Sequence, residues 1–141
     1  MYREDILANR IKWGEFLCEP ERKGYKGELE NLDNPEERCC LGHACHLFTP
    51  DSREVHGEFI YYAEYNYLVA PKPVEELLGL YRDNGEVSRR NGGAMGYSSL
   101  ASANDGGKTP QEIGAYILSC VEGGVDTPFK PLSDYPRKED L

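Results

Sequence analysis

The stretch TPQEIGAYILSC, residues 109–120, decides more about the fold than any other part of the chain. Thr109, a proline after it and Glu112 three positions on form the capping-box pattern that starts an α-helix. Apolar side chains then recur at helical spacing, and Gly123-Gly124 marks the end of the segment. The inward-facing residues should be Ile113, Tyr116, Ile117 and Cys120. The stretch therefore predicts an amphipathic helix that covers one side of a core.

Helical signals also occur in four other segments. Residues 3–17 form an amphipathic pattern, and residues 34–48 open with Asn-Pro-Glu-Glu, in which Asn34 would be the cap. A short helix should follow Pro71-Lys72-Pro73 and reach about residue 80. Residues 98–105 predict a short helix or a turn. Helices should therefore dominate the fold.

Strand signals are confined to residues 58–69 (EFIYYAEYNYLV), which are rich in aromatic and branched side chains. They predict one strand or a short pair. The fold class expected is α+β, a compact and mostly helical single domain with a small β-sheet or hairpin. The domain should span residues 1–125, and residues 126–141, with three prolines and mixed charge, should form an extended or partly disordered tail.

Charge and composition exclude several classes of function. The 141 residues carry 25 acidic and 16 basic side chains, a formal net charge of −9. Nucleic-acid binding needs clustered Lys and Arg, so we expect no nucleic-acid partner. The sequence has no apolar run long enough for a membrane span, and the charged segment MYREDILANR does not resemble a signal peptide. Five cysteines, an odd number, fit free thiols in a reducing cytoplasm.

The segment CCLGHACH, residues 39–46, offers the residue types of a metal site or a thiol nucleophile. On a helix, Cys39, His43 and His46 would share one face, which is the weak alternative of a zinc site. Cys39 or Cys45 beside a histidine is the corresponding alternative of a thiol enzyme. No Cys-x-x-Cys pair supports the zinc reading. We therefore expect no cofactor, no metal and no catalysis.

Cationic and amide side chains gather in three loops that are far apart in the sequence. If the loops converge, they form a local anion pocket on an otherwise acidic protein. Lysines and arginines would meet phosphates, tyrosines would stack bases, and Asn104 and Thr109 would donate hydrogen bonds. The predicted ligand-binding residues are Lys23, Tyr25, Lys26, Arg89, Arg90, Tyr97, Asn104, Lys108 and Thr109.

These motifs occur in a familiar order. The chain resembles a group of small bacteriophage proteins that carry a Lys/Gly-rich segment, a Cys-Cys-Leu-Gly helix and a Ser-Leu-Ala-x-x-Asn-Asp segment. The corresponding stretches here are residues 23–29, 39–45 and 99–107, and the resemblance spans about residues 1–120. Ala103 stands where those proteins usually have leucine. The resemblance implies a phage accessory protein that acts in the cytoplasm of the infected bacterium.

Resemblance and residues together lead to one main hypothesis. The protein would sequester a cyclic nucleotide immune signal, as viral sponge proteins do, without catalysis and with a small anionic nucleotide as its partner. The first alternative is an acidic inhibitor that binds a host defence protein, in the manner of anti-CRISPR proteins. The second is a small thiol- or zinc-dependent enzyme. A homodimer is the commonest assembly for such a protein.

Overall fold

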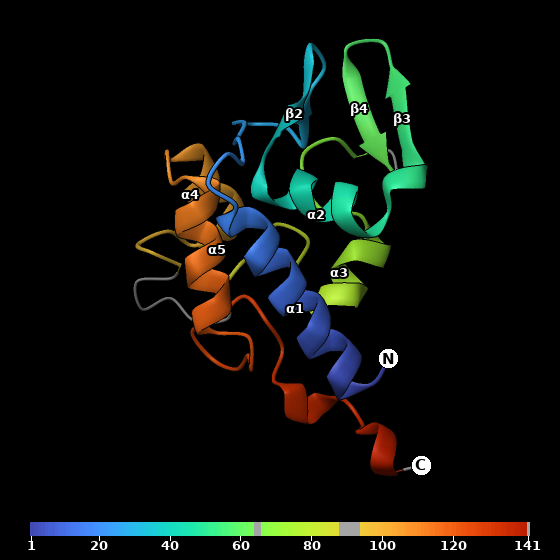
Figure 1. Ribbon diagram of the computed structural model, residues 1–141, viewed down its shortest axis with the longest axis vertical. Coiled ribbons are helices and arrows are strands. Elements are labelled where there is room, and N and C mark those ends of the chain that lie inside the picture. The colour runs from blue at the N-terminus through green and yellow to red at the C-terminus, as the bar shows by residue number, and fades with distance from the viewer. Residues whose placement is uncertain (64–65, 88–93, 141) are drawn as a thin grey trace.

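Two helices, α1 (Arg3–Cys18) and α5 (Pro110–Ser119), pack along each other at the centre of the fold (Figure 1). Their backbones come close where Gly14 faces Gly114: a Cβ added at Gly114 would lie 2.7 Å from the Gly14 carbonyl oxygen. The computed structural model describes residues 1–63, 66–87 and 94–140. In these residues it shows helices and two small antiparallel hairpins, which confirms the predicted α+β class.

The remaining elements lie around this pair of helices. Both hairpins stand at one end of the molecule, above α2 in Figure 1, and the two chain ends lie at the other. In chain order the elements are β1 (Glu30–Asn31), β2 (Asn34–Arg38), α2 (Cys40–Phe48), β3 (Arg53–His56), β4 (Phe59–Tyr62), α3 (Lys72–Leu78) and α4 (Leu100–Asp105). Strand β1 pairs with β2, and β3 pairs with β4.

Four of the five predicted helical segments are confirmed: α1, α3, α4 and α5 begin or end within about two residues of the positions expected. The predicted capping box of α5 is present. Thr109 Oγ1 accepts the Glu112 N–H at 3.1 Å, and the Glu112 carboxylate accepts the Thr109 N–H at 3.0 Å. In the described residues no helix is long and apolar enough to cross a membrane.

The helix predicted over residues 34–48 was wrong in its first third. Residues 34–38 form strand β2, and α2 starts at Cys40. The Asn34 side chain accepts the Glu36 N–H at 3.1 Å, a local turn that competes with capping. The cap is Cys39 instead, whose sulfur accepts the Gly42 N–H at 3.3 Å.

Within the described part of residues 58–69, the strand prediction holds for β4. Its partner β3 lies in residues 53–56, outside the segment in which strands were expected. The two strands pair from Arg53 with Tyr62 to His56 with Phe59, and Gly57 turns between them at φ +62°. Every residue of β3 is exposed, so the strand lacks the alternating apolar pattern by which strands are found in sequence.

Glu30 joins the two hairpins. Its side chain is fully buried and accepts hydrogen bonds from Arg38 Nε at 3.1 Å, Arg53 Nη2 at 2.6 Å and the Tyr62 hydroxyl at 2.5 Å. A buried carboxylate is tolerated only with such partners. The ion pairs and hydrogen bonds therefore fix β1, β2, β3 and β4 relative to one another.

Residues 127–135 pack against the core, although the sequence assigned residues 126–141 to a tail outside the domain. Phe129 is fully buried and lies edge-on to Trp13, with ring centres 6.3 Å apart. Arg10 Nη2 donates to the Lys130 carbonyl at 2.8 Å. The predicted boundary at residue 125 therefore does not hold, because a buried ring and a buried cation fix the extended chain that follows.

Candidate functional site

Two loops that lie about eighty residues apart in the sequence meet at the start of α5. They enclose a pocket of about 460 Å³, called the lysine pocket below. Its lining residues are Gly24, Tyr25, Lys26, Asn104, Gly107, Lys108, Thr109 and Pro110. The volume lies within the range of small-molecule sites. Five of the nine predicted ligand-binding residues, Tyr25, Lys26, Asn104, Lys108 and Thr109, are thus brought together.

Polar side chains hold the first of these loops in place. Asn104 Nδ2 donates to the Tyr25 carbonyl at 2.7 Å, and Asp105 Oδ1 accepts the Gly27 N–H at 2.8 Å. Further back along the loop, His43 Nε2 lies 2.6 Å from the Lys23 carbonyl oxygen. These contacts fix a segment that has almost no regular secondary structure of its own, so the pocket wall is preformed.

The predicted role of Asn104 as a donor to ligand was wrong. The residue is only 3% exposed, and both ends of its side-chain amide are hydrogen-bonded within the protein. The oxygen accepts the Cys40 N–H at 3.2 Å, while the nitrogen holds Tyr25 and Asp105. Asn104 is therefore a positioning residue that joins the pocket wall to the start of α2.

Lys26 and Lys108 supply the positive charge of the pocket. Lys26 is exposed and makes no ion pair among the described residues, and its Nζ lies 4.0 Å from where a Cβ on Gly107 would stand. Lys108 Nζ lies 3.7 Å from a Glu112 carboxylate oxygen, a weak surface pair. The two ammonium groups stay available to an anion.

The start of α5 already has an acidic partner. The backbone and side chain of Thr109 hold the Glu112 carboxylate, and these hydrogen bonds lower the pKa of Glu112. An anion at this helix start would compete with Glu112. The lysines, rather than the helix terminus, therefore provide the anion-binding character of the pocket.

Two of the remaining predicted residues, Tyr97 and Lys23, lie outside the pocket lining. The Tyr97 hydroxyl donates to the Gly106 carbonyl at 3.3 Å, and its ring covers Gly106 beside the pocket. Lys23 lines a different pocket, described below. Arg89 and Arg90 lie outside the described residues. Tyr25, which is half-buried, is the aromatic side chain that lines the pocket.

The thiols of the cysteine-histidine helix, Cys39, Cys40 and Cys45, are buried. Among the described residues, no group of three His, Cys, Asp or Glu side chains is placed to hold a metal ion. Burial raises the pKa of Cys39 to about 11 and raises the pKa of Cys45 as well, so both remain thiols at neutral pH. His43 Nε2 is hydrogen-bonded to the Lys23 carbonyl, and its Nδ1 is buried with no hydrogen-bond partner in the described chain.

Lowering the pH from 7 to 5 should reduce the free energy of unfolding by about 2 kcal/mol through His43. Burial lowers the pKa of His43 to about 4 in the folded protein, against the ordinary value near 6.5 when the chain is unfolded. The unfolded chain therefore binds more protons in this window. The contribution of His43 to the free energy of unfolding is fully present above pH 6.5, and it is lost as the pH falls towards 4. Urea unfolding at both pH values measures the loss.

The control for this pH dependence is a pair of histidine variants. His43→Gln retains a donor for the Lys23 carbonyl and should reduce the dependence between pH 7 and 5, leaving the smaller share that comes from groups such as His46. His56→Gln, in the exposed strand β3, should leave it unchanged. An equal pH dependence in His43→Gln and in the wild-type protein would contradict the assignment.

A scan against protein-family models and searches of curated proteins and of solved structures gave no match to this chain. The site is therefore interpreted from its own geometry.

Proposed function

We propose that this protein binds a small nucleotide in the lysine pocket and sequesters it without chemical change. The observation that supports the proposal is the meeting of Tyr25 and Lys26 with Lys108 and Thr109 around one preformed recess. Two ammonium groups suit a phosphate, and the half-buried Tyr25 offers a ring face for a base. A cyclic nucleotide signal of a bacterial defence system fits this chemistry and the resemblance to phage accessory proteins.

The electrostatics of the chain favour a small ligand over a polymer. A net charge of −9 repels long polyanions, whereas two lysines in a recess attract a short one locally. Binding should weaken as salt is added, because both ammonium groups are accessible to solvent. Nucleotide capture by such a pocket needs no catalytic group.

Isothermal titration with a panel of cyclic mononucleotides and cyclic dinucleotides tests the proposal. At least one member should bind, and Lys26→Ala should weaken that binding at least tenfold, since a charged hydrogen bond contributes about 1.5–3 kcal/mol. Lys108→Ala should act in the same direction. The measurement is the dissociation constant at fixed salt.

Lys130→Ala is the matched control for the two lysine variants. Lys130 is exposed and follows the far end of α5, so its loss changes the net charge equally without touching the pocket. Its affinity should equal that of the wild-type protein. Absence of binding by every member of the panel, or equal losses in Lys130→Ala and Lys26→Ala, would contradict the proposal.

A further inference from the structure

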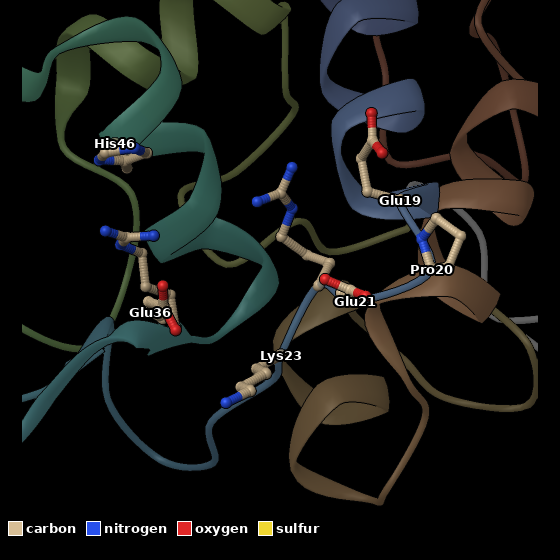
Figure 2. A pocket seen from close by; sticks show the side chains of 8 residues that line it. Glu19, Pro20, Glu21, Lys23, Glu36 and His46 are labelled. Carbon is tan, nitrogen blue, oxygen red and sulfur yellow. The ribbon is translucent and has the colours of Figure 1, made fainter.

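A second pocket, of about 730 Å³, lies on the other side of the loop that follows α1. It is called the arginine pocket below. Figure 2 shows Glu36 and His46 on one side of it and the chain from Glu19 to Lys23 on the other. Its lining residues are Glu19, Pro20, Glu21, Arg22, Lys23, Glu36, Arg38 and His46. None of the lysine-pocket residues lines it.

Phe16 orients the Arg22 side chain in this pocket. Its Nε donates to the Phe16 carbonyl at 2.9 Å, and its guanidinium carbon lies 3.4 Å from the centre of the Phe16 ring. No ion pair of Arg22 is found in the described residues. Because stacking and one hydrogen bond fix the group through Nε, its two terminal nitrogens are left to bind something else.

Arg38 is oriented in a similar way from the opposite wall. Its Nε donates to the buried carboxylate of Glu30 at 3.1 Å, and the residue is only 8% exposed. Glu30 is shared with Arg53 and Tyr62, so it neutralises Arg38 incompletely. Arg38 also makes a side-chain hydrogen bond with the Tyr62 hydroxyl, and the remaining N–H groups of its guanidinium are those that can bind a ligand.

The pocket lining balances three cations, Arg22, Lys23 and Arg38, with three carboxylates, and its two arginines lie near enough for the charge of Arg38 to act on Arg22. Desolvation lowers the pKa of Arg22, and the charge of Arg38 lowers it further, although Glu19 opposes the shift. At His46, desolvation again lowers the pKa first, followed by Arg38 and Arg22 against the opposing charge of Glu30. Two guanidinium groups that repel each other across a recess are stabilised when an anion lies between them.

We propose that the arginine pocket binds the terminal phosphate of a small phosphorylated molecule between the side chains of Arg22 and Arg38. A planar carboxylate has two oxygens, which pair with the N–H groups of one guanidinium. A tetrahedral phosphate has enough oxygens to bind both guanidinium groups and the Lys23 ammonium group. Neutral His46 adds a donor or an acceptor. Glu19, Glu21 and Glu36 in the lining disfavour a long polyanion such as nucleic acid.

Inorganic phosphate, followed by NMR of the isotopically labelled protein, tests this site directly. The expected result is saturable shifts at the amides of residues 21–23 and at the His46 ring. Arg22→Gln should raise the dissociation constant for phosphate at least tenfold. Arg82→Gln, which alters an exposed arginine paired with Glu86, should leave it unchanged. Lys26→Ala should also leave it unchanged, which separates this site from the lysine pocket.

Two further measurements test phosphate binding in the unaltered protein. Bound phosphate should raise the pKa of His46, because an anion near the ring stabilises the imidazolium form. Acetate at the same concentration should shift the NMR signals of residues 21–23 and of the His46 ring far less than phosphate does. Shifts confined to residues 25–27 and 107–109, equal shifts with acetate, or unchanged affinity in Arg22→Gln would each overturn the proposal.

Discussion

Arg10→Met should reduce the free energy of unfolding by about 3–5 kcal/mol, one of the two largest effects expected for a single substitution in this protein. Arg10 is fully buried and donates to the carbonyls of Leu78, Val121 and Lys130, each at 2.8 Å. Methionine would fill much of the space but leave these oxygens without donors. Chemical denaturation at pH 7 measures the loss.

The size of this effect follows from what Arg10 connects. It lies on α1, yet the carbonyls that it binds belong to the end of α3, the chain after α5 and the segment after Phe129. Its guanidinium also lies 4.5 Å from the Phe129 ring centre. Burial lowers the pKa of Arg10 to about 10, so the group stays charged at neutral pH. One side chain thus holds three separate segments against α1.

Lys12→Met is the matched control for Arg10→Met. Lys12 is exposed on the same helix, and its ammonium group lies 5.8 Å from the Phe48 ring centre. Replacing Lys12 should lower the free energy of unfolding by less than about 1 kcal/mol. A loss below about 1 kcal/mol in Arg10→Met itself would show that the carbonyls find other partners and that Arg10 does not hold the C-terminal segment.

Gly42→Ala should destabilise the fold by more than about 3 kcal/mol, although alanine is the better helix former by about 1 kcal/mol. A Cβ at this position would lie on the Leu29 carbonyl oxygen, 1.8 Å away. That oxygen accepts the Cys39 N–H at 3.2 Å, and Leu29 is fully buried. The segment that enters β1 would have to move away from α2. Thermal or urea unfolding measures the effect.

Gly24→Ala provides the comparison for Gly42→Ala. The nearest atom to its added Cβ is a Pro110 side-chain carbon at 3.4 Å, an ordinary contact. Its effect on stability should therefore stay within about 1 kcal/mol. Similar stabilities for Gly42→Ala and Gly24→Ala would mean that the close approach of Leu29 to α2 is not a fixed feature of the fold.

Local sequence signals predicted the helices well because each is strong within a few residues. The Thr109–Glu112 capping box and the proline at the start of α3 act through neighbouring backbone groups, so they can be seen without the fold. Residues 34–38 were misassigned because Asn34-Pro35 suits both a helix start and a turn. Their pairing with β1 decided between the two.

Buried charge was the part of the fold that sequence could not predict. Arg10 and Glu30 look like surface residues in their local context, yet both are buried and bonded to segments far away in the chain. The same holds for Phe129, which lies in a proline-rich segment and still completes the core. Such contacts depend on tertiary partners that no local pattern identifies.

The candidate site was predicted in part. The sequence analysis proposed an anion pocket on the condition that the loops converge, and the lysine pocket brings Tyr25 and Lys26 together with Asn104, Lys108 and Thr109. The sequence could not show that the Asn104 side chain is hydrogen-bonded to the backbone of Tyr25 and Cys40. Asn104 looked like a free polar group until these neighbours were placed.

Nucleotide capture by the lysine pocket can be measured by mass spectrometry of the small molecules released from the purified protein. We expect a phosphorylated nucleobase compound from the wild-type protein and from Lys130→Ala, and a much smaller amount from the Lys26→Ala/Lys108→Ala double variant. Equal amounts from the double variant, or no nucleotide from any of the three proteins, would contradict it.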